Sequence, residues 1–220
     1  MESGSLGELT PPAQRMVTIA LDGSVRLGRL INDILDVERI ESGVLVLDPA
    51  RHPVRSVVES AVGQVQVLAA EAGVAVALGR IEGEIHADAD RAVQTLINLL
   101  GNAFKFSYPG GRVLVSAEPQ GAFVEFAVRD AGRGIPPDRL SSIFGRFEQV
   151  DSSDAREKGG FGLGLAISKS IVERSGGRIW AANNADRGAT LRFTLPRADD
   201  SPGPASDQPE NTDLRVRAPV

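Results

Sequence analysis

The chain of 220 residues contains no cysteine, which excludes disulfide bonds and thiolate metal sites and fits a reducing compartment. It has no signal peptide, and no apolar run approaches the roughly 20 residues that a membrane-spanning helix needs. No stretch is dense in lysine and arginine, and the net charge of −5 argues against a general nucleic-acid binder. We therefore expect a soluble, cytoplasmic chain, whose parent protein is free to be membrane-anchored through segments outside this sequence.

The length allows one domain with a real core plus an appendage. Residues 1–9 are small and polar, and we expect a disordered or added start. Thr10 before two prolines is typical of a helix start. Apolar residues then recur at helical spacing, namely Val17, Leu21, Leu27, Ile31, Ile34 and Val37. Residues 10–43 are predicted to hold one long helix.

The apolar stripe of this helix must pack against something. Two partners fit: a second copy of the helix in a dimer, or the chain's own main domain. We favour the dimer, because Ser42-Gly43 and Asp48-Pro49 separate the helix from the main domain.

Residues 44–197 carry both the helical and the strand period and are predicted to form the main domain. Helices are expected at 54–72, 88–104, 137–144 and 161–175, and strands at 74–78, 84–87, 111–118, 122–129, 178–182 and 189–195. The polar stretch 146–159 is expected to be a mobile loop. This order predicts an α/β (α+β) two-layer sandwich preceded by one long helix. Residues 198–220, rich in Asp, Pro, Ser and Gly, are expected to be a disordered acidic tail.

Three short segments carry the candidate chemistry. They are Asn98-Leu-Leu-Gly-Asn102-Ala-Phe-Lys105-Phe106, Asp130-Ala-Gly132-Arg-Gly134-Ile135 and Gly160-Phe-Gly162-Leu-Gly164-Leu165. The first places two amides on one helical face, with a lysine one turn beyond. The second places a carboxylate beside glycines, which let a flat ligand approach the backbone. The third runs into an apolar helix whose free N–H groups suit phosphates. Together the segments predict a nucleotide site and indicate ATP.

These segments, with Phe144-Gly-Arg146-Phe147 between the last two, resemble the N, G1, F and G2 boxes of sensor histidine kinases of two-component systems. The stretch 29–43 resembles the second helix of that family's dimerisation and phosphotransfer hairpin. The resemblance covers about residues 10–196. It implies the Bergerat-type ATP-binding fold of the gyrase, Hsp90 and MutL group, with a mixed sheet and helices on one face.

The resemblance implies ATP and Mg²⁺ as cofactors. Asn102 is implied as the Mg²⁺ ligand and Asn98 as a second contact, direct or through water, and amide oxygens suit this ion. Lys105 and Arg146 would neutralise phosphate charge. Asp130 would accept a hydrogen bond from the adenine amino group, which favours adenine over guanine.

The resemblance also implies further nucleotide contacts. They are Phe106 on the face of the base, Gly132, Gly134 and Ile135 beside it, Gly160, Gly162, Leu163 and Gly164 in a lid with Gln149 and Lys158, and Thr190 near the adenine. Phe161 stands where the family commonly has a small hydroxyl residue.

Position 98 bears on the reaction. In the hydrolytic relatives this position resembles a glutamate that acts as a general base, but an asparagine amide cannot take a proton. The resemblance therefore implies phosphoryl transfer, in which positioning and charge neutralisation dominate and a neutral imidazole is the nucleophile.

The family's acceptor histidine lies in a motif that this sequence lacks. His52 and His86 are the two histidines, and neither has the adjacent acid of that motif. We expect both to be structural or solvated, and we expect no self-phosphorylation. The resemblance implies that the sequence begins near the loop between the two hairpin helices.

Three functions remain open. The first is the catalytic region of a histidine kinase, with a histidine-bearing hairpin helix, a response-regulator receiver domain and a homodimer through residues 10–43 as partners. The second is a non-catalytic ATP-binding regulatory module that signals through its lid or its helix. The third, an ATP hydrolase of the gyrase type, fits poorly because of Asn98.

Overall fold

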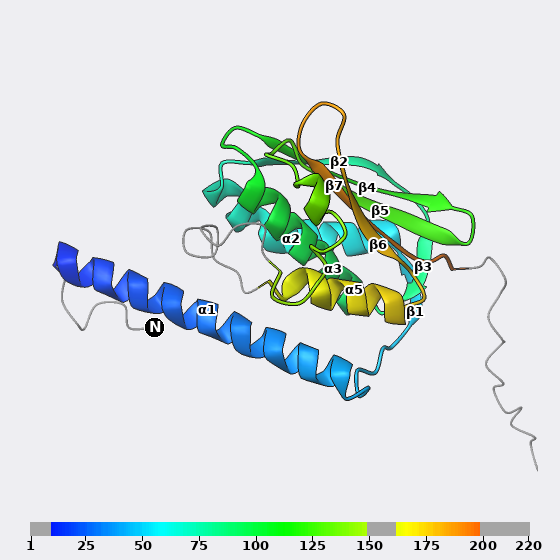
Figure 1. Cartoon of the computed structure of the whole chain (residues 1–220), viewed down its shortest axis with the longest axis horizontal. Coiled ribbons are helices and arrows are strands. Elements are labelled where there is room, and N and C mark those ends of the chain that lie inside the picture. Colours follow the sequence, from blue (N-terminus) through cyan, green and yellow to red (C-terminus); the bar gives the residue numbers. More distant parts are fainter. Residues whose placement is uncertain (1–9, 149–161, 199–220) are drawn as a thin grey trace, which may run out of the picture.

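The computed structural model describes residues 10–148 and 162–198, in which a sheet is covered on one face by helices while one long helix extends beside them (Figure 1). In chain order the elements are α1 (Pro11–Glu41), β1 (Ala50–Pro53), α2 (Val54–Glu71), β2 (Ala75–Ile81), β3 (Glu84–Ala87), α3 (Ala89–Phe106), β4 (Arg112–Gln120), β5 (Phe123–Arg129), the 3-10 turn η1 (Pro137–Arg139), α5 (Gly164–Arg174), β6 (Ile179–Asn183) and β7 (Ala189–Pro196). No helix in these two ranges is long and apolar enough to cross a membrane.

The main sheet has five strands in the order β2-β4-β5-β7-β6, and β1 pairs with β3 in a separate two-stranded sheet. Within the main sheet β2 and β4 are parallel, and the other neighbours are antiparallel. The mixed sheet confirms the predicted two-layer α/β sandwich with helices on one face.

The core lies between α2, α3 and the inner face of the main sheet. Side chains alternate across a strand, so β5 directs Val124, Phe126 and Val128 inward, and all three are fully buried. Phe126 stacks on Phe193 of β7, with the ring centroids 4.6 Å apart. This aromatic pair joins the central strand β5 to its neighbour β7 beneath the helices.

The C-terminal half of α1 packs against the main domain. Asp36 accepts hydrogen bonds from Arg91 and Gln94 of α3 at 3.2 and 2.7 Å. Apolar side chains beside it join a second, smaller core with the start of α5. Its members are Leu30, Val37, Ile40, Leu45, Leu47, Leu163, Ile167 and Ile171.

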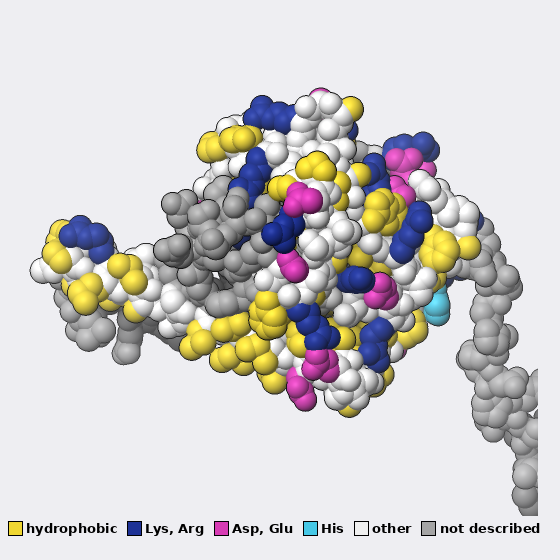
Figure 2. Space-filling view, viewed as in Figure 1, with side chains coloured by type: hydrophobic (Ala, Val, Ile, Leu, Met, Phe, Trp, Pro, Cys, Tyr) yellow, Lys and Arg dark blue, Asp and Glu magenta, His cyan; other side chains and the backbone are white. Residues whose placement is uncertain are grey.

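The N-terminal half of α1 leaves its apolar side chains exposed. Met16 and Ile19 are 72% and 70% exposed, and Figure 2 shows hydrophobic side chains along this helix. Packing on the chain's own domain therefore holds for the C-terminal half. Pairing of α1 in a dimer stays a prediction.

Four predicted details are wrong. The predicted helix 137–144 is η1 followed by separate turns, in which Ser142 N–H reaches Arg139 O and Gly145 N–H reaches Ser142 O. The predicted helix from residue 161 begins at Gly164, because the left-handed φ of +71° at Gly162 cannot continue into a right-handed helix.

The other two errors concern strands. β1 lies in a stretch for which neither a strand nor a helix is predicted, and it forms because it pairs with β3, a contact that its own four residues do not reveal. Pro119 is predicted in the turn between β4 and β5 but lies in β4, opposite Val124. The predicted start 1–9, most of the predicted loop 146–159 and the predicted tail from residue 199 lie outside the described residues.

We expect the stacked pair of Phe126 and Phe193 to contribute strongly to the free energy of unfolding. Replacing Phe126 with alanine should lower the free energy of unfolding by about 3–5 kcal/mol, because a stacked ring is lost from a fully buried position. Equilibrium unfolding in urea measures this change. The control is Val46→Ala, at a site 83% exposed, which should change stability by less than about 0.5 kcal/mol. Equal losses in both variants would contradict the prediction.

Candidate functional site

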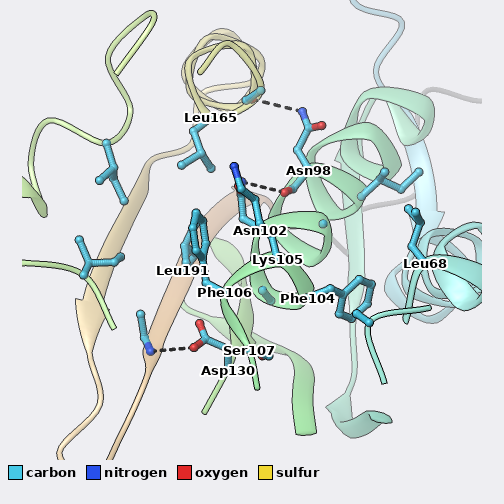
Figure 3. Close-up of a pocket in the computed structure, with 18 of the residues that line it drawn as sticks. Leu68, Asn98, Asn102, Phe104, Lys105, Phe106, Ser107, Asp130, Leu165 and Leu191 are labelled. Carbon is cyan, nitrogen blue, oxygen red and sulfur yellow. Dashed lines mark hydrogen bonds between the residues drawn. The ribbon is translucent and has the colours of Figure 1, made fainter. Parts of the chain in front are cut away.

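A cavity of about 1110 Å³ is lined by residues of α2, α3, the start of α5 and the loop that comes after β5, and by Asp33 of α1. Figure 3 shows Asn98 pointing to α5 at one end of the cavity and Asp130 at the other. Nine predicted site residues line it: Asn98, Asn102, Lys105, Phe106, Asp130, Gly134, Ile135, Gly162 and Gly164. The fold therefore brings the three candidate segments to one place.

α3 divides the site from the core. Leu96, Leu99 and Leu100 on one side of the helix are fully buried, whereas Asn98 and Asn102 on another side line the cavity. The Asp88 carboxylate caps the helix by accepting a hydrogen bond from the Arg91 N–H at 3.1 Å. Burial of the apolar face thus sets the direction in which the amides point.

Both amide side chains use their nitrogen atoms to bind protein. Asn98 Nδ2 donates to Gly164 O and to Ser168 Oγ of α5, both at 3.2 Å. Asn102 Nδ2 donates to Asn98 O, one turn earlier, at 3.0 Å. These bonds orient the amides and leave their Oδ1 oxygens as the atoms available to a cation or to water.

Two cations lie over the ring of Phe106 at the end of α3. Lys105 Nζ is 5.0 Å and Arg133 Cζ is 4.7 Å from the ring centroid. These distances are within the range of cation–π attraction, so the ring helps to hold both charges at the edge of the cavity. The sequence did not identify Arg133.

Asp130 is the buried charged group of the site, at 5% exposure. Its Oδ1 accepts hydrogen bonds from Gly132 N–H at 2.8 Å and from Ala189 N–H at 3.3 Å. Burial raises the pKa of the Asp130 carboxyl above its ordinary value, although these backbone donors act in the opposite direction. The carboxylate is therefore desolvated and held in one orientation.

Two glycines permit the close packing around Asp130. A Cβ at Gly132 would lie 2.1 Å from Phe106 O, so only glycine lets this loop approach the end of α3. A Cβ at Gly188, which has φ +77°, would lie 2.3 Å from Asp130 O. Gly132 thus supports the loop beside the cavity without lining the cavity itself. Gly188 was not identified from the sequence.

Three other predicted residues do not line the cavity. Arg146 forms an ion pair with Glu41 at the end of α1. Leu163 is buried in the second core beneath α1, and Thr190 Oγ donates to Asn184 Oδ1 at 2.6 Å. The predicted lid residues Gln149, Lys158 and Gly160 lie outside the described residues.

The sequence also missed two asparagines in the turn from β6 to β7. Asn183 bonds the backbone of Ile135, and Asn184 bonds the backbone of Asp130. The asparagines and the following Asp-Arg-Gly are a turn signal in the sequence, but that signal does not say which distant loop the turn touches.

The described residues contain no cluster of three His, Cys, Asp or Glu side chains that would hold a metal by themselves. A metal ion at this cavity would therefore depend on the amide oxygens of Asn98 and Asn102 together with oxygens of a bound ligand. Hard ions such as Mg²⁺ suit such a donor set, because they retain several waters and take ligand phosphate oxygens.

Comparison with known proteins agrees with the geometry. Residues 87–199 match the family model described as histidine kinase-, DNA gyrase B- and HSP90-like ATPase. The circadian input-output histidine kinase CikA of Synechococcus elongatus is 34% identical over 201 residues. That match covers 87% of this chain but 26% of CikA.

Solved structures lead to the same group. The full-length ShkA structure in complex with AMPPNP has a TM-score of 0.74 and 30% identity, covering 87% of this chain and 40% of ShkA. The histidine kinase ThkA in complex with the response regulator protein TrrA has a TM-score of 0.67 and 20% identity, covering 88% of this chain and 54% of ThkA, and shows the fold alone. This chain thus spans about a quarter of CikA, two fifths of the ShkA chain and half of the ThkA chain.

The raised pKa of Asp130 predicts a pH effect on stability. The folded state binds the proton more tightly than the unfolded state, so ionisation of this carboxyl opposes folding. Relative to Asp130→Asn, the wild type should lose unfolding free energy as the pH rises above about 4. The neutral amide keeps an oxygen for the two backbone donors, so the variant should be at least as stable at pH 7.

Asp186→Asn is the matched control. The pKa of Asp186 is lowered, chiefly by backbone hydrogen bonds, so the wild type should gain stability over this variant as the pH rises through the same range. Urea unfolding at a series of pH values measures both slopes. Slopes of the same sign for Asp130→Asn and Asp186→Asn would contradict the assignment.

Proposed function

Since this chain belongs to the family of histidine kinase-, DNA gyrase B- and HSP90-like ATPases, we propose that its cavity holds Mg²⁺–ATP for phosphoryl transfer to a histidine. Within this family the chain is the ATP-binding catalytic region of a sensor histidine kinase. The observation that carries the proposal is the meeting of Asn102, Lys105, Asp130 and Gly164 around one cavity. ShkA, which shares the fold at 30% identity, is bound to an ATP analogue.

Asp130 is proposed to recognise adenine. Both backbone donors bind its Oδ1, so among the described residues Oδ2 is the oxygen left to accept a hydrogen bond from a ligand. The adenine amino group is such a donor, whereas guanine has a carbonyl at that position and would meet the carboxylate with like charge. Gly134 and Ile135 would form the wall beside the base, and Phe106 would pack near its face.

The phosphates are proposed to lie between α3 and the start of α5. The first N–H groups of α5 have no intrahelical partner and suit anionic oxygens, and Lys105 adds a positive charge. Asn102 Oδ1, with Asn98 Oδ1 as a second contact, would hold Mg²⁺, which neutralises phosphate charge when bound. Gln149, Lys158 and Gly160 stay predicted lid contacts.

Transfer is proposed in place of hydrolysis. Asn98 is not a base, because its amide is bonded to α5 through its nitrogen and cannot accept a proton. The chain's own residues then orient ATP and neutralise its charge, and a neutral imidazole attacks without further activation.

The acceptor imidazole is proposed to come from another chain or segment. His52 lies in β1 and His86 in β3, the two strands that pair in the small sheet. Neither histidine lines the cavity. The proposed phosphate acceptor is a hairpin helix that carries the family's histidine, docked beside α1, with residues 10–43 forming a homodimer. ThkA, which has the same fold, is bound to a response regulator, and a receiver domain is the proposed final partner.

Phosphoryl transfer tests this function. The chain is incubated with γ-³²P-ATP, Mg²⁺ and a fragment bearing the histidine hairpin of a related kinase. We expect acid-labile, alkali-stable label on the fragment and none on the chain alone. Labelling of the chain itself, or ATP binding without any transfer to a histidine fragment, would contradict the proposal, and the second result would favour the regulatory module.

The variant Asn102→Ala tests whether Asn102 is a ligand of the metal ion. The variant should lower the Mg²⁺-dependent part of ATP affinity by at least roughly tenfold, since an oxygen ligand is lost. Calorimetry with a non-hydrolysable ATP analogue, with and without Mg²⁺, measures this part. Asp90→Ala, on the exposed first turn of the same helix, is the control and should leave it unchanged. An equal fall in affinity without Mg²⁺ would argue against Asn102 as a ligand.

Arg146 is proposed to reach the phosphates by leaving Glu41. Both side chains of this ion pair are about half exposed, at 44% and 50%, so the pair is weak and its loss is worth at most about 1 kcal/mol. Glu41→Gln should therefore raise the affinity for the ATP analogue by about two- to fivefold and leave that for adenosine unchanged. Glu38→Gln, the same charge change one turn earlier on α1, is the control. A gain of equal size for adenosine would contradict a phosphate contact.

A further inference from the structure

The turn from β6 to β7 contacts the loop after β5, whose residues Asp130 and Ile135 line the cavity. Asn183 is the last residue of β6, and its side chain bonds both polar backbone atoms of Ile135. Its Oδ1 accepts from Ile135 N–H at 2.8 Å, and its Nδ2 donates to Ile135 O at 2.6 Å. The Asn183 carboxamide thus makes the two backbone hydrogen bonds with Ile135 that a neighbouring strand would make in a sheet.

Asn184 holds Asp130 in a similar way. Its Nδ2 donates to Asp130 O and to Arg187 O, both at 2.8 Å. Its Oδ1 accepts from the Thr190 hydroxyl at 2.6 Å, and its own N–H donates to Gly188 O at 3.0 Å. All hydrogen atoms of the side-chain amide are used, so the group has one orientation.

The loop that these asparagines contact needs such support. Between Arg129 and Pro137 the chain forms neither strand nor helix, and Gly134 has a left-handed φ of +75°. The N–H of Asp130 donates to Ala189 O at 2.9 Å, so its peptide is fixed on one side by β7 and on the other by Asn184. Ile135 is fixed by Asn183 alone among the described hydrogen bonds.

We propose that Asn183 and Asn184 are positioning residues of the adenine pocket, with Asn184 setting the place of the base-reading carboxylate and Asn183 the place of the wall at Ile135. This inference rests on the proposed function. Recognition of an amino group against a carbonyl depends on where one carboxylate oxygen lies, and small displacements of a site group weaken such discrimination strongly. Base selectivity therefore depends on Asn184, and general nucleotide affinity depends on Asn183.

A merely structural role makes a different prediction. Asn183 is exposed and Asn184 is half-buried in a surface turn, where a lost hydrogen bond changes stability modestly. Such a role would lower the melting temperature while leaving the ratio of ATP to GTP affinity as it is. For Asn184 the selectivity ratio is thus the readout that separates the two roles. For Asn183 the readout is the affinity for both nucleotides, which a role in the turn alone would not change.

The test compares binding of non-hydrolysable ATP and GTP analogues in the wild type, Asn184→Asp and Asn183→Asp. Asn184→Asp keeps the oxygen that accepts from Thr190 but removes both donated bonds and places negative charge against Asp130 O. It should lower the ATP to GTP affinity ratio by about five- to tenfold. Asn183→Asp should weaken both nucleotides by a similar factor, with the ratio unchanged.

Asp186→Asn is the control in the same turn, because Asp186 pairs with Arg129 and touches neither Asp130 nor Ile135 through a described bond. It should change neither the affinities nor the ratio. Asn184→Ala, which adds no charge, replaces Asn184→Asp if that variant does not fold. An unchanged ratio in both Asn184 variants overturns this inference alone, whereas a wild type that binds neither nucleotide overturns the proposed function.

Discussion

Packing of α3 against the inner face of the sheet is the constraint on which the rest of the site depends. The helix buries Leu96, Leu99 and Leu100 completely, so it cannot rotate without losing its largest apolar contacts. Asn98 and Asn102 share this rigid helix. The side-chain nitrogen of Asn98 donates to α5, and that of Asn102 donates to Asn98 O. The same burial that stabilises the domain therefore places both asparagines at the cavity.

Asp130 shows the opposite relation between stability and function. A buried carboxylate is unfavourable, and burial accordingly raises its pKa. The fold lowers this cost with two backbone N–H donors to Oδ1 and with two glycines that allow close packing. A desolvated and immobile carboxylate is a poor stabiliser, but it is well suited to distinguish a donor from an acceptor on a base.

α1 contacts both helices that border the site. Its C-terminal half contacts α3 through Asp36 and α5 through the second core, and Glu41 at its end forms an ion pair with Arg146. Arg174 of α5 also donates to Ile40 O and Gly43 O at the end of this helix, both at 3.2 Å. A shift of α1 would therefore move groups at the start of α5, where the proposed phosphates lie.

The sequence by itself determined most of the elements and which segments gather at the cavity, because periodicity and motif spacing are local properties. It predicted the long helix, the two-layer sandwich and the three segments that meet at the cavity, including Asn102, Lys105 and Asp130. Only the tertiary structure decided which residues the long side chains and the side chains in turns contact. Arg146 meets Glu41, and Asn183 and Asn184 meet the loop after β5, because segments about 50 to 100 residues apart become neighbours. Such contacts leave no periodic trace in the chain, since they depend on how separate elements pack and not on the residues that lie beside them in sequence.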